Sequence, residues 1–249
     1  MARTCAFCGK NELTKEHLFA KWVRKQYEHL RASGPGDVEF FRNEDPVWSY
    51  SGDAPEHVVR AFCKDCNNGW MSQMETNASK VMAPMLRANI NGPVKLRYAE
   101  QAYIASWAAK TAYVLQQLHP ADDLIPTSDY RDFHRKQQPS SNVFVTIGAR
   151  HIAGSSKGAN VFEYKARFIG EKSRGIHHAH FVVGAIYFGI ATFVGRERRY
   201  PTGLNDEVDR GVKVIWPLTR EVLWPCPSIS DVGGLDGMFN TVTTAFWGL

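Results

Sequence analysis

Two pairs of closely spaced cysteines constrain this chain more than any other feature. Cys5 and Cys8 form one C-x-x-C pair, and Cys63 and Cys66 form a second. Paired loops of this spacing supply four thiolates to a tetrahedral Zn²⁺ ion, with Zn–S bonds of about 2.3 Å and no position left for water. The sequence therefore predicts a structural zinc site that joins two segments 55 or more residues apart.

Polar residues of the kind used in catalysis lie close to the cysteine pairs. Glu16 and His17 are adjacent and lie between the pairs, and Asn67 and Asn68 directly follow the second pair. Glu75 lies one or two turns further along a predicted helix. Imidazole is a base near neutral pH, and carboxylate and amide oxygens suit Mg²⁺ or Mn²⁺. We therefore expect these five residues to form a site supported by the zinc.

The bulk composition indicates an ordinary globular protein. The 249 residues are 44% hydrophobic and 22% charged, and no apolar run reaches the length that a membrane span requires. The first five residues lack the apolar stretch of a secretory signal. Cysteines in metal-binding pairs favour a reducing compartment, so we expect a cytoplasmic location. The fifth cysteine, Cys226, lies between two prolines and is expected to be structural.

The charge is mildly basic. The formal net charge is +5, with +1 on residues 1–92 and +4 on residues 93–249. This balance is compatible with a polyanionic partner such as nucleic acid, and it places most of the excess outside the cysteine-rich part.

The first part of the chain is predicted to hold short elements around the cysteines. Thr14 is suited to cap a helix beginning near Lys15, and residues 33–56 are rich in turn-forming residues and predict a loop with a short strand at 38–41. Val58–Phe62 predicts a strand, and residues 68–88 predict a helix. A stop signal follows, so we expect one domain over residues 1–92 and another over residues 93–249.

The second part predicts helices followed by an antiparallel sheet, and the whole chain is expected to be α+β. Residues 98–118 are apolar on most sides and predict a core helix, and residues 129–135 predict a helical turn. Segments rich in β-branched and aromatic residues then predict strands at 143–148, 161–168, 180–194 and 212–216.

The order of these motifs resembles HNH-type nucleases. The resemblance covers residues 5–75 and is closest to the subgroup in which a ββα-metal motif is braced by a four-cysteine zinc site. It implies that His17 activates water as general base and that Glu16 binds a catalytic divalent ion. Asn67, Asn68 or Glu75 would supply the ligand from the helix. It further implies a metal-dependent endonuclease that hydrolyses phosphodiester bonds of DNA, with Mg²⁺ or Mn²⁺ as the catalytic ion.

The chain departs from the family pattern at two positions. The helix-side ligand of the family is usually His, whereas position 71 is Met71, which makes Glu75 the replacement candidate. The family's central Asn would lie a few residues before Cys63, where His57 is the nearest substitute. A zinc-stabilised module that binds nucleic acid or protein without catalysis is therefore the alternative.

Two further hypotheses concern the second part of the chain. The zinc site would be purely structural if the working pocket lay there, lined by Tyr103, Trp107 or His178. The run His177, His178, Ala179 and His180 also suggests a second metal site, because alternate residues of a strand share a face.

Overall fold

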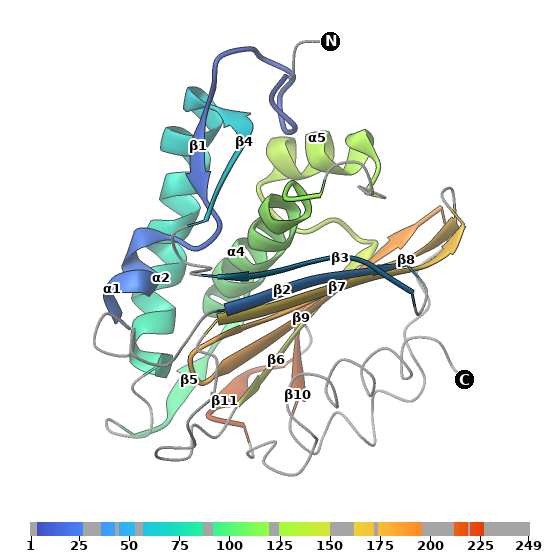
Figure 1. Ribbon diagram of the computed structural model, residues 1–249. Helices are drawn as coiled ribbons and strands as arrows, with labels where there is room; N and C mark the ends of the chain where they lie inside the picture. Colours follow the sequence, from blue (N-terminus) through green and yellow to red (C-terminus); the bar gives the residue numbers. More distant parts are fainter. Residues whose placement is uncertain are drawn as a thin grey trace.

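The computed structural model of the chain shows a mixed helix-and-sheet, α+β architecture (Figure 1). A group of helices and a short strand pair containing the cysteine-rich segments lies beside one large sheet. The structure describes residues 4–26, 36–42, 45–52, 57–86, 92–119, 125–149, 162–171, 174–195, 212–218 and 220–226.

An antiparallel strand pair brings the two cysteine pairs together. Strand β1 (Leu13–His17) pairs with β4 (Val58–Cys63), with His17 opposite Val58 and Leu13 opposite Cys63. The helix expected near Lys15 is therefore wrong, because this segment satisfies its backbone by pairing with β4. The predicted helix cap, Thr14, instead donates its hydroxyl to the Phe62 carbonyl at 3.1 Å. The first helix, α1 (Lys21–Gln26), begins only after the strand.

A helix follows β4 directly, as the sequence predicts. It consists of a wide first turn, η3 (Cys66–Met71), and the regular helix α2 (Ser72–Leu86). A kink lies inside η3 at Gly69, whose φ of −93° and ψ of −111° are non-helical. Met74 faces the core, as expected, while Trp70 is half-buried. Two antiparallel strands and a helix thus surround the cysteines.

Seven strands form the large sheet, in the order β10-β6-β9-β8-β7-β2-β3. The five strands of this sheet that follow residue 140 pair antiparallel with one another. The segment predicted as one strand over 180–194 is two strands, because the chain turns between Val183 and Ile186. The strand bounds are β6 (Val143–Ala149), β7 (Phe162–Glu171), β8 (Arg174–Val183), β9 (Ile186–Val194) and β10 (Val212–Trp216).

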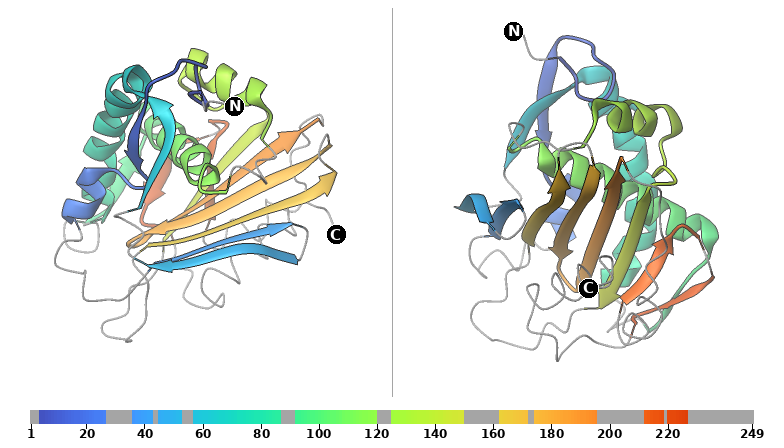
Figure 2. Two further views of the ribbon diagram at one scale, coloured as in Figure 1. Left: turned by 45° about the horizontal axis from the view of Figure 1, so that its top comes forward. Right: turned by 90° about the vertical axis from the view of Figure 1, so that its right-hand side faces the viewer.

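The segment 33–56, predicted to be a loop with a short strand at 38–41, contains that strand within a hairpin at the edge of this sheet (Figure 2). Strands β2 (Gly36–Arg42) and β3 (Asp45–Gly52) pair antiparallel, and β2 pairs parallel with β7. The sheet is therefore not wholly antiparallel. Phe40 is buried, with its ring centroid 5.4 Å from that of Tyr164. The turn-rich composition misled the prediction because an edge strand tolerates polar and glycine residues that a central strand would exclude.

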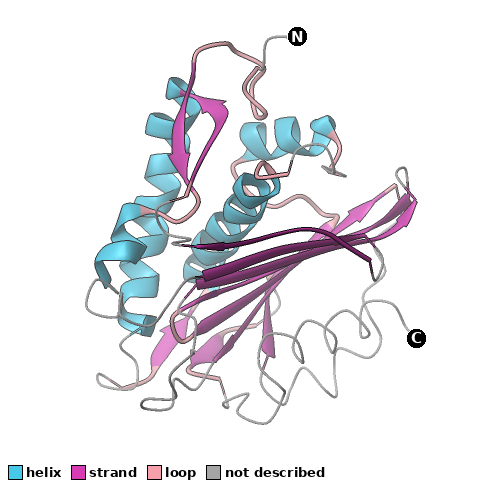
Figure 3. Ribbon diagram, in the orientation of Figure 1, coloured by secondary structure: helices cyan, strands magenta, loops and turns pink. Residues whose placement is uncertain are grey.

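The helices lie on one side of the sheet (Figure 3). Helix α4 (Tyr98–Gln116) confirms the predicted core helix, and α5 (Thr127–Lys136) confirms the predicted helical turn. Trp107 of α4 is fully buried, and its ring packs 5.8 Å from Phe181 and 5.5 Å from Phe188, which lie on β8 and β9. Helix α2 packs against α4 on its other side.

Buried contacts continue across the predicted boundary at residue 92. One hydrophobic core cluster joins side chains from both parts, and the β2–β3 hairpin of the first part belongs to the sheet of the second. The division into two domains stays a prediction. A small sheet of β5 (Val94–Leu96) and β11 (Val222–Trp224) lies near the boundary. Cys226 is buried, and within the described residues no helix has the length and apolar character needed to cross a bilayer.

Candidate functional site: a four-cysteine cluster beside a carboxylate pocket

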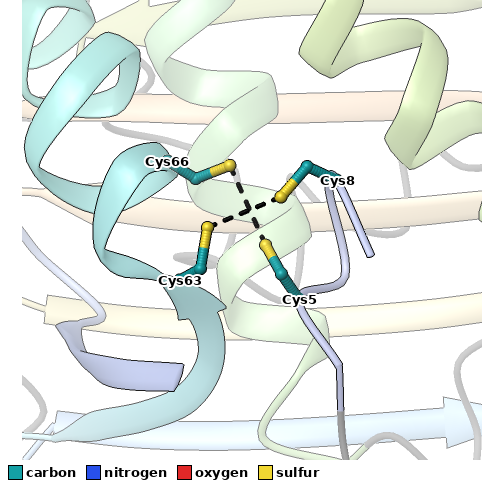
Figure 4. Close-up of side chains that lie close together, drawn as sticks. All are labelled: Cys5, Cys8, Cys63 and Cys66. Atoms are coloured by element: carbon teal, nitrogen blue, oxygen red, sulfur yellow. Dashed lines mark hydrogen bonds between the residues drawn. The ribbon is translucent and has the colours of Figure 1, made fainter. Parts of the chain in front are cut away.

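The four paired cysteines meet at one point (Figure 4). All four Sγ atoms lie within 4.8 Å of one another, with Cys5 3.8 Å from Cys66 and Cys8 3.5 Å from Cys63. Zn–S bonds of about 2.3 Å in a tetrahedron would place the sulfur atoms roughly 3.8 Å apart. The cluster could therefore hold a metal ion, and it is compatible with structural zinc. None of the four cysteines is in a disulfide.

The local backbone prepares this cluster for thiolates. Gly9, directly after the first pair, has φ of +76°, a conformation that glycine adopts without strain. Burial alone would raise the pKa of the Cys5 thiol, but hydrogen bonds from backbone groups of Cys8, Cys63 and Phe7 outweigh it and lower the pKa. Burial raises the pKa of the Cys66 thiol, and a bound cation would favour its thiolate form.

The first cysteine loop is anchored to the helices by an aromatic side chain. Phe7 is fully buried, and its ring stacks on Phe62 and meets the edge of Trp70, both at a centroid distance of 4.9 Å. Tyr130 and Phe133 of α5 lie 5.7 and 6.1 Å from the same ring. The cysteine cluster is therefore fixed to α5 as well as to the β1–β4 pair.

A pocket of about 470 Å³ opens beside the cluster, between β1 and the helix that follows β4. All five residues singled out in the sequence line it: Glu16, His17, Asn67, Asn68 and Glu75. The structure thus brings these residues together from two segments. Lys15 and Lys21 also line the pocket and add positive charge at its exposed edge.

Asn67 ties the two sides of the pocket together. Its Nδ2 donates to Thr14 Oγ1 and to the Lys15 carbonyl, both at 3.0 Å. This amide therefore holds the start of the helix against β1. The Asn67 side chain therefore fixes the shape of the pocket through Nδ2, and its Oδ1 atom is a separate candidate ligand.

Two of the carboxylates that line the pocket, Glu16 and Glu75, contact a buried charged residue that the sequence analysis did not identify. Lys110 of α4 donates from Nζ to Glu75 Oε1 at 2.8 Å, and the same nitrogen lies 3.6 Å from Glu16 Oε1. Its side chain is completely buried. A signal was present, because Lys110 is the sole charged residue between positions 101 and 116 of an otherwise apolar helix. A buried lysine requires an acidic partner.

The ionisation of these groups follows from their burial. Burial raises the pKa of Glu16 from an ordinary value near 4.5 to about 7, and the Glu75 carboxylate adds to the rise while Lys110 opposes it. Burial alone would lower the pKa of Lys110, but the two glutamates outweigh it and raise that pKa. Lys110 is therefore a permanent ammonium, and Glu16, which lines the pocket, exchanges its proton near neutral pH.

The predicted ligands of a catalytic ion are arranged around this ammonium. Among the described residues, the four cysteines are the sole group of three or more Cys, His, Asp or Glu side chains close enough to share a metal. Glu16, His17 and Glu75 do not converge in this way. Their donor chemistry still suits Mg²⁺ or Mn²⁺, because such ions are commonly held by one or two carboxylates and completed by water and substrate phosphate.

The histidines of β8 are buried in the sheet. His177 Nε2 lies 2.8 Å from Gln116 Oε1, and burial lowers the pKa of His177 to about 4. His180 Nδ1 contacts the Tyr187 hydroxyl. The second metal site suggested by this histidine run is not among the metal-ligand groups of the described residues.

The residues named for a pocket in the second part of the chain lie apart. Trp107 packs on Phe181, whereas His178 lies three positions away along β8 and so on the opposite face of the sheet. Tyr103 is 44% exposed. These three side chains therefore do not form one site.

Comparison with known protein families, curated proteins and solved structures found no match to this chain. The functional argument consequently depends on the geometry of the pocket.

Proposed function

We propose that this protein is a metal-dependent endonuclease of the HNH type that hydrolyses phosphodiester bonds of DNA. The observation that carries the proposal is the convergence of Glu16, His17, Asn67, Asn68 and Glu75 on one pocket. That pocket lies between an antiparallel strand pair and the helix that follows it, which is the order of elements in a ββα-metal motif.

The four-cysteine cluster is, in this proposal, a closed structural zinc site. Four sulfur ligands complete a tetrahedron, so the ion has no open position for substrate or water. It clamps the loop before β1 to the end of β4 and thereby holds the two walls of the pocket. The pairing of Lys10 Nζ with Asp65 at 2.8 Å links the same two loops at the surface.

The residues of the pocket divide the chemical work. His17 ends β1 and lines the pocket, where its imidazole accepts the proton of an attacking water. Glu75 and Glu16 hold a divalent cation, which when bound would offset the charge developing on the phosphate. Lys15 and Lys21 attract the nucleic acid backbone, and backbone N–H groups at the start of the helix, at Asn67 and Asn68, favour a phosphate.

The experiment that tests this function is cleavage of supercoiled plasmid by the zinc-loaded protein with Mg²⁺ or Mn²⁺. We expect nicking that EDTA abolishes and that His17→Ala lowers by roughly 100-fold or more, as loss of a general base does. His134→Ala is the matched control, because His134 is also half-buried near the zinc loops but does not line the pocket. Full activity of folded His17→Ala, or no cleavage of DNA or RNA with either ion, would reject the proposal.

A second candidate is a zinc-stabilised module that binds nucleic acid without cleaving it. The ion pairs of Lys110 favour it, because the ammonium already neutralises carboxylates that a catalytic ion would use. Such a module would shift DNA in a gel with or without EDTA and would leave the plasmid intact. Loss of binding in Lys15→Ala or Lys21→Ala with unaltered zinc content would locate the bound strand at the pocket.

A further inference from the structure

Helix α4 places a fixed positive charge against Glu16 and Glu75, two carboxylates that line the pocket. Lys110 Nζ lies 2.8 Å from Glu75 and 3.6 Å from Glu16, and its side chain has no exposed surface. Glu16 is 7% exposed as a residue, so it is also largely withdrawn from water. The three groups come from β1, α2 and α4, and each is held in place by the charge of the others.

The ammonium lies against the same carboxylate oxygens that we propose for a divalent ion. A cation that approaches these oxygens meets a like charge a few ångströms away, with little water to screen the repulsion. Removing the ammonium would leave two neighbouring carboxylates without a counter-charge, which is a stronger cation site. The same ammonium also fixes where the carboxylates point.

We infer that Lys110 is a positioning residue of this pocket, which holds Glu16 and Glu75 in place and competes with a divalent cation for their oxygens. This inference deepens the proposed function and rests on it for the role of the cation. The carboxylates of the pocket belong to residues 1–92, whereas the ammonium that holds them belongs to residues 93–249. Both parts of the chain therefore contribute to the site.

Two opposite effects distinguish this role from a purely structural one. Without the ammonium, the carboxylates bind a cation more tightly, yet they are less well oriented for cleavage. A lysine that serves packing alone would lower stability when replaced and leave the affinity for the cation unchanged.

The test is a Mn²⁺ titration of zinc-loaded Lys110→Met without nucleic acid, followed by the rise in unfolding temperature. Methionine keeps most of the length of the side chain and removes its charge. We expect half-saturation at a Mn²⁺ concentration lower than that of the wild type by roughly tenfold or more, since a like charge within 4 Å is removed. An unchanged or higher concentration overturns the inference.

If Lys110→Met does not fold, a second pair of variants compares the affinity for Mn²⁺ with and without the Lys110 ammonium. Glu16→Gln retains the Lys110–Glu75 pair, and Glu16→Gln with Lys110→Met leaves a single carboxylate. The double variant should again bind Mn²⁺ more tightly than Glu16→Gln, and equal affinity overturns the inference. Lys80→Met removes an exposed lysine from the same helix as Glu75 and should leave the titration unchanged.

Plasmid cleavage separates this inference from the proposed function. At saturating Mn²⁺, Lys110→Met should cleave more slowly than the wild type, although it needs less Mn²⁺ to do so. If the wild type does not cleave but Lys110→Met binds Mn²⁺ more tightly, the nuclease proposal fails and the role of Lys110 stands. If the wild type cleaves and both proteins need the same Mn²⁺, the nuclease proposal stands and the role of Lys110 fails.

Discussion

Among the described residues, the four-cysteine cluster and the Glu16–Glu75 pair are groups of acidic side chains that differ in their source of positive charge. The four thiols at the β1–β4 pair lie near an exposed lysine, Lys10, which pairs with Asp65, and their geometry suits an external metal ion. The two carboxylates of the pocket are paired with Lys110 from a helix outside the cysteine-rich part. We therefore expect the first cluster to depend on a bound metal ion for its stability, whereas the second already has an internal cation in Lys110.

The largest effect should come from removing the metal of the first cluster. Zinc binding to small zinc domains contributes an apparent free energy of about 10 kcal/mol or more at neutral pH. We therefore expect Cys66→Ser to lose the bound zinc, measured by mass spectrometry, and to melt the β1–β4 region at ordinary temperature. Cys226→Ala is the control, because Cys226 is buried away from the cluster and its loss should leave one zinc per chain. If Cys66→Ser retained its zinc, the four thiols would not be the ligands of the ion, and the contrast with the carboxylate cluster would fail.

The second effect concerns the internal cation. Breaking a buried ion pair by removing one partner typically costs about 3–5 kcal/mol, because the remaining charge is buried without compensation. Lys110→Met should lower the free energy of unfolding in urea by this amount at pH 8. Replacing both Lys110 and Glu75, by Met and Gln, should recover part of the loss. An additive loss in the double variant would show that the two residues do not act as a pair.

The third effect is the pH dependence that Glu16 adds to the free energy of unfolding. Glu16 has a pKa of about 7 in the folded protein against about 4.5 when unfolded, so the folded state binds its proton more tightly. Stability contributed by this group is therefore lost as the pH rises from about 4.5 to 7, by at most about 3 kcal/mol. Glu16→Gln should gain stability relative to the wild type over this range, measured by urea unfolding at pH 5 and pH 8. The pH dependence of zinc binding is common to both proteins and cancels in the difference.

The smallest effect is expected at the surface ion pair between the two cysteine loops. Lys10 and Asp65 are exposed, and water and salt screen their attraction. Lys10→Met should unfold at the same urea concentration as the wild type within error and keep its zinc. If Lys10→Met lowered the free energy of unfolding as much as Lys110→Met, the difference in exposure between Lys10 and Lys110 would not explain their contributions to stability.

Several elements could be predicted because their signal is local. The strand at Val58–Phe62, the helix after Cys66 and the apolar helix over 98–118 each have a clear periodicity within one segment. The short strand predicted at 38–41 is part of β2, but the predicted helix at Lys15 and the loop predicted around 38–41 failed for a shared reason. Both segments are strands because of a partner elsewhere in the chain, β4 in one case and β7 in the other.

The sequence by itself identified the four cysteines that could hold a metal ion, because the C-x-x-C spacing places two thiols on one loop. Its resemblance to a nuclease motif indicated the five residues that line the pocket. The tertiary structure alone decided that Glu16 and Glu75 meet Lys110, which is separated from Glu75 by 35 positions. The physical reason is that a buried charge selects its partner by distance in space, and packing of α2 on α4 sets that distance. A chain in which α4 packed elsewhere would have the same motifs and a differently charged pocket.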